Sequence, residues 1–398
     1  MNASPRAPTL RLLDYYVIEG LNAFAATTFL LGIFFWARVR FDYTATESLA
    51  LGALQGLGHM IGSHIGGPLS DRWGYNRTVV TGIAVIAVLT LTAWLPDLRL
   101  LPFLVIAAYS AAIGLTWPAL EGGAMHLPGT INMPQRLGIY NLVWSFTGTA
   151  GFALSGWLFE HSVNAIFWIP GLIHLAQLIW IGLQRGRHPI HGEAAMALPH
   201  LGDHTPPARK QQLTRMSWLS NSTGYFLVGG FSALTPFIGE RLGLSPAWSI
   251  WLGCLLLFAR AVSFIVLYRW SGWHYHPAWS HYALWSAPIY LAVVFFADHL
   301  AVTATACTLL GFSLGLSYYM SIYYTLDASE HKGAQGGRHE ALIGLGILLG
   351  PLVGAVGGAA TGSTPGAMAT LIAAALVITA AGAYRISTAR NAPSSPAA

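Results

Sequence analysis

The sequence predicts an all-α membrane protein with twelve transmembrane helices in two six-helix bundles. Three observations support this fold class. The 398 residues are 54% hydrophobic and only 9% charged, whereas about a quarter of the residues in soluble domains are charged. About twelve apolar stretches are long enough to cross a bilayer. The two halves of the chain also resemble each other at an offset of about 200 residues.

Apolar stretches that can cross roughly 30 Å of hydrocarbon recur along the whole chain. Short polar or glycine-rich segments separate them, including a turn near Asp298 and another at Gly362–Pro365. The first twelve residues show no cleavage pattern of a signal peptide. We place the spans at residues 15–36, 46–66, 78–96, 100–120, 137–158, 163–183, 215–238, 246–268, 278–297, 300–325, 339–360 and 366–384.

Residues 184–213 lie between the sixth and seventh predicted spans and are too polar to cross a membrane. They predict a cytoplasmic linker between bundles at residues 1–183 and 214–398. Four histidines in this segment could indicate a metal site, but their spacing is irregular and no Cys or acidic cluster accompanies them. We therefore expect a solvated linker and no bound metal, although the linker contains His188, His191, His200 and His204.

The distribution of basic residues predicts the orientation of the chain in the membrane. Of the 20 Lys and Arg residues, Arg260 falls inside a span and four fall in segments predicted to be exterior, namely Arg38, Arg40, Arg99 and Arg241. The remaining fifteen fall in segments predicted to be cytoplasmic. This bias follows the positive-inside rule and predicts that both termini are cytoplasmic. It also explains the net charge of +5 without a nucleic-acid partner.

Short motifs repeat between the two halves. Gly114-Leu115-Thr116-Trp117 in the fourth span recurs as Gly315-Leu316-Ser317-Tyr318 in the tenth. Arg136, Gly148 and Gly156 of the fifth span align with Arg338, Gly350 and Gly358 of the eleventh. Agreement on nearly one offset, half the length of the chain, indicates two parallel repeats of six helices.

A charged, turn-forming segment at Gly67–Arg77 separates the second and third spans. Glycine and proline at its start predict that one helix ends near Gly67 and the next begins near Asn76. The spacing Gly-x-x-x-Asp-Arg-x-Gly-x-x-Arg resembles the loop 2–3 motif of the major facilitator superfamily of transporters. The twelve spans, the central linker and the internal repeat have the same layout as that family.

The resemblance implies a gate on the cytoplasmic side. Asp71 would lie near the N-terminus of the eleventh helix, where the helix dipole favours a carboxylate. Arg72 and Arg77 would pair with an acid, and we expect Glu121 to be that partner. Gly67 and Gly74 would allow the turn and a close helix approach. We also assign Arg136 and the pair formed by Arg338 and Glu340 to this gate.

Several family motifs are absent. The fourth span has no arginine of the kind linked to proton transfer, and the fifth span lacks the Gly-Pro motif of drug antiporters. Uptake is therefore favoured over export, with a proton-driven drug or metabolite exporter as the alternative. A membrane-embedded enzyme would require acid–histidine or metal-ligand clusters at one depth, which the sequence does not show. A receptor that does not transport is the third alternative.

Polar residues at membrane depth are the candidates for proton coupling. Glu19 is the only acid within the first span, and Asn22 lies on the same helix face. His59 could relay protons near neutral pH and shares a face with Gln55. Arg260, in the middle of the eighth span, would be the counter-ion of an acid or an anchor for an anionic substrate.

Aromatic and amide side chains in the fifth, seventh and tenth spans are the candidates for substrate binding. The resemblance implies that these helices line a central cavity, where flat rings with polar atoms could stack on and hydrogen-bond a solute. The candidates are Tyr140, Asn141, Trp144, Asn221, Tyr225, Tyr319 and Tyr323, together with Asn22 and Gln55.

These observations predict a secondary transporter that moves a small polar or amphipathic organic molecule by alternating access, coupled to protons. No phosphate-binding loop is present, so we expect no nucleotide and no other cofactor. The partners would be the solute, protons and the lipid bilayer. We expect a monomer in the cell membrane, which would be the inner membrane in a Gram-negative bacterium.

Overall fold

The computed structural model describes residues 10–95, 98–127, 133–184, 205–327 and 332–388. Within these ranges the chain forms twelve α-helices and no β-strand, which confirms the all-α prediction. The helices are α1 (Leu12–Phe41), α2 (Ala45–Trp73), α3 (Tyr75–Thr92), α4 (Leu101–His126), α5 (Met133–His161), α6 (Ala165–Leu183), α7 (Pro207–Arg241), α8 (Pro246–Arg269), α9 (Pro277–Phe296), α10 (Leu300–Asp327), α11 (Lys332–Thr361) and α12 (Thr364–Thr388).

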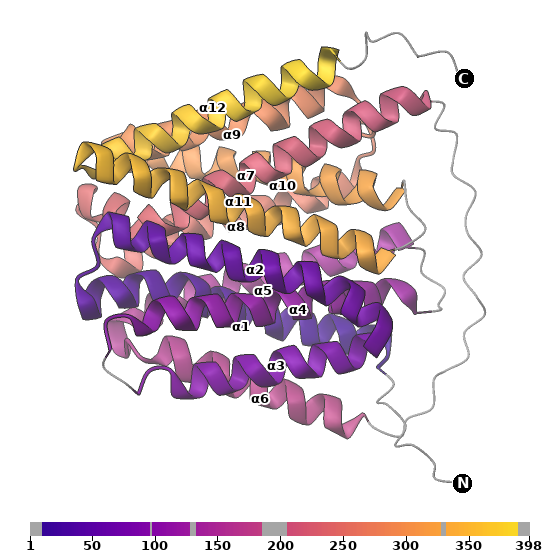
Figure 1. Ribbon diagram of the computed structural model, residues 1–398, viewed down its shortest axis with the longest axis horizontal. Helices are drawn as coiled ribbons and strands as arrows, with labels where there is room; N and C mark the ends of the chain where they lie inside the picture. Colours follow the sequence, from indigo (N-terminus) through magenta and orange to yellow (C-terminus); the bar gives the residue numbers. More distant parts are fainter. Residues whose placement is uncertain (1–9, 96–97, 128–132, 185–204, 328–331, 389–398) are drawn as a thin grey trace.

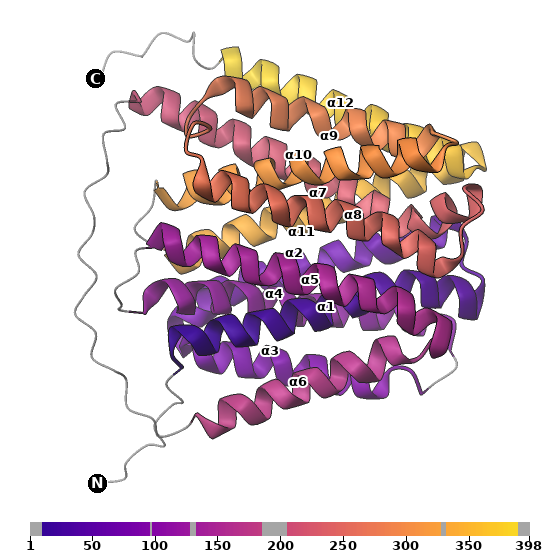
Figure 2. The same cartoon turned by 180° about the vertical axis from the view of Figure 1, so that it is seen from behind.

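The helices run side by side along one axis and gather in two groups. Helices α1–α6 form one half of the molecule and α7–α12 the other, in both views (Figures 1 and 2). The start of α1 and the end of α12 lie at the same end of the helices, which we call the terminal end; we call the other the distal end. The first residues of α7 fall within the segment predicted as linker. The four histidines of that linker lie outside the described residues.

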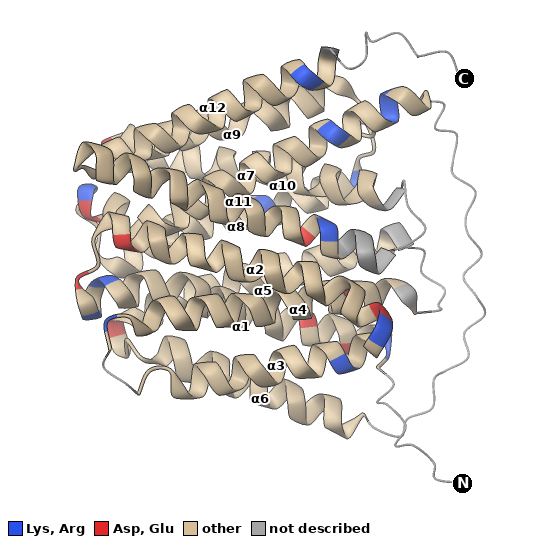
Figure 3. Ribbon diagram, in the orientation of Figure 1, with Lys and Arg blue, Asp and Glu red and all other residues tan. Residues whose placement is uncertain are grey.

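Nine of the twelve helices are long and apolar enough to cross a membrane, counting only the residues that the structure describes. The other three, α2, α7 and α9, lie among them and have similar or greater length. Charged side chains are concentrated at the two ends of the helices and are sparse between them (Figure 3). This distribution is the one that a hydrocarbon layer around the middle requires.

The prediction that a helix ends near Gly67 is wrong. Helix α2 continues through Pro68 to Trp73, and the turn into α3 is made by Gly74 alone, at φ 90° and ψ 141°. Close packing of α2 on α4 compensates for the cost of a proline inside the helix. The two backbones approach closely at Gly66, where a Cβ atom would lie 2.8 Å from Cα of Leu115 in α4. The hydroxyl of Ser70 also donates to the Gly67 carbonyl at 2.7 Å.

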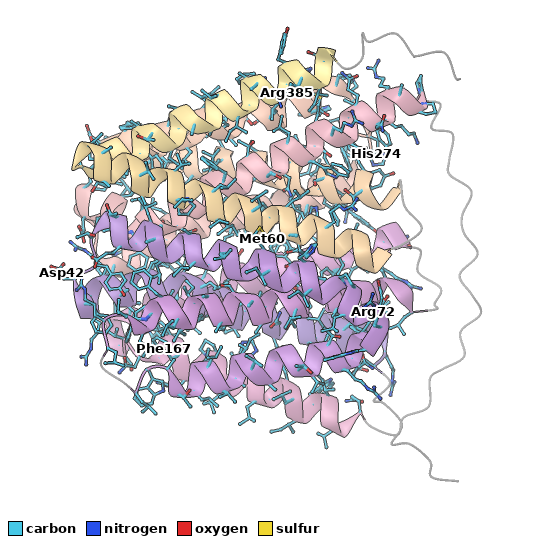
Figure 4. All side chains as sticks on the ribbon, viewed as in Figure 1. Asp42, Met60, Arg72, Phe167, His274 and Arg385 are labelled. Carbon is cyan, nitrogen blue, oxygen red and sulfur yellow. The ribbon has the colours of Figure 1, made fainter. Side chains whose placement is uncertain are left out.

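The two halves meet most closely where α2 packs against α11. Glycines bring the backbones together: a Cβ atom at Gly56 would lie 2.1 Å from the Leu348 nitrogen, and one at Gly344 would lie 2.5 Å from the Met60 nitrogen. Met60 marks this contact near the centre of the molecule (Figure 4). Further towards the terminal end, a Cβ atom at Gly337 would lie 3.1 Å from Cα of Gly67.

A second contact between the halves joins α5 and α8. A Cβ atom at Gly253 would lie 2.3 Å from the Phe152 ring, near the distal end, and one at Gly138 would lie 2.7 Å from the Tyr268 ring, near the terminal end. At the distal end, an ion pair of 3.0 Å between Arg38 in α1 and Glu240 in α7 also joins the halves. The halves are therefore in contact at both ends of the helices.

Candidate functional site

Three carboxylates lie buried between the helices, at a depth where charge is costly. Glu19 of α1, Glu121 of α4 and Glu340 of α11 expose only 1%, 6% and 7% of their surface. They are close enough to interact electrostatically with one another. The sequence identifies Glu19 as a buried acid, and the structure adds two partners from other helices.

His59 connects this acid cluster to the contact between the halves. Its Nε2 lies 3.0 Å from Oε2 of Glu340, and both side chains are buried. The hydroxyl of Ser63 lies 3.5 Å from the same nitrogen, and the Trp117 ring packs edge-on against the imidazole at 5.4 Å. Because His59 belongs to α2 and Glu340 to α11, this pair joins the two halves of the molecule.

The environment of Glu340 differs from the predicted gate. We expected Glu340 to pair with Arg338 near Asp71, but its carboxylate faces His59 and Arg338 is exposed. The reason is helix periodicity: residues two positions apart on a helix point in different directions. Glu340 therefore belongs with the buried polar residues rather than with the charged end of the molecule.

The remaining residues assigned to the gate lie around the terminal end. Asp71, Arg72 and Arg77 are exposed, and the hydroxyl of Tyr75 donates to Asp71 at 3.1 Å. The predicted pairing of Arg72 and Arg77 with Glu121 does not form in the described part of the chain, because Glu121 is buried and Oε1 has no hydrogen-bond partner there.

Arg136 was also assigned to the gate. It is buried and donates to the Leu127 carbonyl, so it ties the start of α5 to the end of α4.

Tyr140 and Asn22 surround Glu19. The Tyr140 hydroxyl lies near the Glu19 carboxylate, and Asn22 lies beside it one helical turn further on; Oε2 of Glu19 has no hydrogen-bond partner among the described residues. Asn22 is fully buried, yet neither polar atom of its amide has a partner of standard hydrogen-bond geometry among the described residues. Two of the predicted substrate-binding residues thus lie next to the acid predicted for coupling.

Arg260 lies across the site, in α8. It is 8% exposed, and its guanidinium carbon lies 4.6 Å from the centre of the Trp144 ring. Nη1 donates a 3.4 Å hydrogen bond to the Tyr225 hydroxyl, whereas Nε has no partner among the described residues. No ion pair joins Arg260 to a carboxylate in those residues, which leaves the predicted counter-ion role without support.

Two tyrosines interact with both Arg260 and the acids. Tyr318 interacts electrostatically with Glu340, Glu121 and Arg260, and Tyr225 interacts with both Arg260 and Glu340. The Tyr318 ring lies 5.5 Å from Trp144, edge to face. The site therefore combines a cation, buried acids and phenol groups that interact with both.

The structure places two of the predicted substrate-binding tyrosines elsewhere. Tyr319 packs against Phe264 and Trp273, with centroids 5.6 and 5.5 Å apart. Tyr323 stacks on His274 at 4.5 Å, which lies near the terminal end (Figure 4). The face of α10 that carries Tyr318 was missed, although Tyr318 belongs to the repeated Gly-Leu-Ser-Tyr motif that could have identified it.

The remaining candidates differ in their contacts. Asn141 is buried and accepts a 3.0 Å hydrogen bond from Nε1 of Trp144, while its amide nitrogen has no partner in the described chain. Asn221 is buried and Gln55 is half-buried, and neither makes a side-chain hydrogen bond within the described ranges.

The internal repeat places His59 and Arg260 at matching positions. A Cβ atom at Gly114 of α4 would lie 2.6 Å from the His59 carbonyl oxygen, and one at Gly315 of α10 would lie 3.1 Å from the Arg260 carbonyl oxygen. The same glycines contact Ser63 and Ser263. His59 in α2 and Arg260 in α8 thus lie at the same place relative to the neighbouring helix.

Comparisons with known proteins agree with this architecture. The sequence matches the family model described as Major Facilitator Superfamily over residues 17–351, and no curated protein matches it. Among solved structures, a mutant of the nucleoside transporter NupG has a TM-score of 0.68 at 12% identity, covering 95% of this chain and 99% of that chain. NupG itself has a TM-score of 0.65 at 12% identity, covering 97% and 100%.

The human organic anion transporter MFSD10 (TETRAN) has a TM-score of 0.67 at 15% identity, covering 94% of this chain and 98% of that chain. At such low identities the likeness shows the fold alone. It confirms the predicted arrangement of twelve helices.

Proposed function

The chain belongs to the Major Facilitator Superfamily, and we propose that it carries a small polar or amphipathic organic solute across the membrane together with protons. Family and fold indicate a multi-pass membrane transporter rather than an enzyme. The proton as coupling ion, the solute and the direction are our proposals. Transport would proceed by alternating access, with the two halves rocking about the buried site.

The observation that carries proton coupling is the pair of His59 and Glu340 within the acid cluster. Buried carboxylates that are close together repel one another when ionised, and a histidine beside them can accept or donate a proton. The cluster of Glu19, Glu121 and Glu340 contains no Lys or Arg partner among the described residues. Protons are the simplest cations that can neutralise it.

The position of this pair supports a link between protonation and movement. His59 and Glu340 face each other across the α2–α11 contact, so their attraction holds the two halves together when both carry charge. A proton that neutralises Glu340 removes that attraction. We propose that Glu19 and His59 take part in the same proton exchange, and that Asn22, Tyr140, Trp144 and Tyr225 contact the solute.

Orientation and domain division complete the proposal. We propose that the terminal end is cytoplasmic, with the bundles at residues 1–183 and 214–398 moving as units. Exposed basic residues at that end, including Arg72, Arg77 and Arg215, support this orientation. At the distal end, Arg38 and Arg99 are instead paired with Glu240 and Glu47. Uptake is the direction we favour.

Proton movement in proteoliposomes tests this function. The purified protein is reconstituted with a trapped pH-sensitive dye, and a panel of small organic solutes is added outside without an imposed gradient. We expect at least one solute to acidify the lumen. Glu340→Gln should abolish the acidification while solute exchange continues, because the mutant amide cannot carry the proton.

Glu160→Gln is the matched control, since Glu160 is exposed at the end of α5; it should behave as the wild type. If solutes exchange across the membrane but none moves protons in the wild type, proton coupling is excluded.

A further inference from the structure

We propose that the solute is an organic anion whose carboxylate binds Arg260. This inference rests on the proposed transport function and names the class of molecule that the same site accepts. The carboxylate would bind the edge of the guanidinium that carries Nε and Nη2, since Nη1 already donates to Tyr225. Trp144, Tyr225 and Tyr318 would surround the body of the molecule.

The first argument is the charge of Arg260. A buried guanidinium without a counter-charge is costly, and such groups in proteins are normally paired. Arg260 is 8% exposed and Nε has no hydrogen-bond partner among the described residues. The planar fork of an arginine fits a carboxylate with two parallel hydrogen bonds. A carboxylate of the solute would supply both the missing charge and the missing acceptor.

The second argument comes from the internal repeat. His59 and Arg260 occupy matching positions in the two halves, beside Gly114 and Gly315. In the first half the ionisable side chain faces a carboxylate of the protein, Glu340. In the second half no carboxylate among the described residues faces Arg260. The solute would therefore provide, on that side, the acid that the protein provides on the other.

The third argument is the surroundings of Arg260. Its guanidinium lies over the Trp144 ring, and Trp144 is held in place by the hydrogen bond from Nε1 to Asn141. The rings of Phe264 and Tyr318 lie 5.7 and 5.5 Å from Trp144. Aromatic rings offer a flat apolar surface to the body of an organic molecule. The same surface offers little to a small inorganic anion, which is fully hydrated in water.

The buried acids of the site favour an anion over a zwitterion. Glu340 is paired with His59, and Glu19 lies near the Tyr140 hydroxyl. Each of these two carboxylates lies beside a side chain that can donate a hydrogen bond to it, whereas Arg260 lies beside an aromatic ring and a phenol. The acids can be neutralised by protons, whereas a guanidinium stays charged, so Arg260 is the group that needs a counter-charge from the solute.

Binding of matched probes tests this inference without any gradient. The full-length protein in detergent is titrated with benzoate, benzamide and benzylammonium, and with nicotinate and nicotinamide, and the shift of the unfolding temperature gives the apparent affinity. The members of each set have similar shape and differ in charge. We expect the carboxylates to bind and stabilise the wild type. The apparent affinity of the amides and of the ammonium compound should be at least about tenfold lower.

Substitutions at Arg260 complete the test. Arg260→Gln should weaken carboxylate binding by about tenfold or more, and Arg260→Lys should restore part of it. Arg269→Gln is the matched control, because Arg269 is an exposed residue at the end of the same helix. If Arg260 only stabilises the fold, Arg260→Gln should lower the unfolding temperature of the ligand-free protein. If Arg260 instead serves to bind a ligand, the unfolding temperature of the ligand-free variant should be unchanged or higher.

Three outcomes would overturn the inference: equal binding of amides and carboxylates, no stabilisation by either carboxylate, or full carboxylate binding by Arg260→Gln. The two proposals fail separately. If carboxylates bind through Arg260 but are transported without protons, the proposal of an organic anion as solute is retained and proton coupling is excluded. If a neutral solute moves with protons and Arg260→Gln leaves its transport unchanged, the coupling stands and the solute class falls.

Discussion

Tyr318 and Tyr319 are neighbours in the sequence with different surroundings in the fold. Tyr318 interacts with Glu340 and Arg260 and lies against Trp144. Tyr319 points about 100° away around the helix and packs on Phe264 and Trp273. A difference in function between these two hydroxyls would therefore report directly on which face of α10 meets the solute.

Removing each hydroxyl in turn tests this face. We expect Tyr318→Phe to lower the initial rate of solute uptake about fivefold, the equivalent of one hydrogen bond of about 1 kcal/mol. Tyr319→Phe should leave the rate within about twofold, because its ring packing is unchanged. Initial rates in proteoliposomes give the comparison. Equal losses in both variants, or a larger loss in Tyr319→Phe, would show that the site lies on the other face.

The sequence could predict which charged residues are buried. It could not predict which residues they contact. Glu19 and Arg260 are charged groups inside apolar stretches, and such groups face the protein interior because lipid cannot solvate them. Their neighbours depend on how each helix is rotated about its axis. The apolar pattern of α10 does not show which of Tyr318 and Tyr319 faces the site, and the repeated Gly-Leu-Ser-Tyr motif is the sequence signal that singles out Tyr318. The pair of His59 and Glu340 is separated by 281 residues.

At the level of elements, α2 shows how packing decides a helix boundary. Gly67 and Pro68 are local signals for the end of a helix, yet the helix continues to Trp73. Glycines along α2 lie against α4 and α11, so the helix is held on two sides. The twelve helices could be predicted because length and apolarity are local properties. This boundary could not, because the contacts that stabilise it come from distant helices.

Gly56 tests whether the close α2–α11 contact is needed. A Cβ atom there would lie 2.1 Å from the Leu348 nitrogen, so Gly56→Ala must push the helices apart. We expect it to destabilise the protein by about 1–3 kcal/mol and to slow transport. Thermal unfolding in detergent and uptake rates measure the two effects.

Gly182→Ala is the control for this substitution. Gly182 lies in α6, where a Cβ atom would have no neighbour within 4 Å, and alanine favours the helix. Its stability should be unchanged or slightly higher. If Gly56→Ala is as stable and as active as Gly182→Ala, the contact between α2 and α11 is not as close as described.

At the scale of the whole molecule, the two halves are joined at both ends and at the centre. The Arg38–Glu240 ion pair lies at the distal end, the contact of Gly67 with Gly337 lies towards the terminal end, and the His59–Glu340 pair lies between them. Of these two ion pairs, only the central one is buried. Exposed ion pairs contribute little to stability, so the protonation of the buried pair is the change best placed to alter how the halves fit together.

The most direct test of this account is the distance between the halves as a function of pH. Spin labels are attached at Val39→Cys in α1 and Leu300→Cys in α10, two exposed distal-end positions, with Cys254 and Cys307 replaced by serine. Double electron–electron resonance then gives the distribution of distances between about pH 5 and about pH 8. We predict that this distribution changes with pH in the wild-type background and is independent of pH in Glu340→Gln. A pH-dependent change of the same size in Glu340→Gln, or none in the wild-type background, would contradict the account.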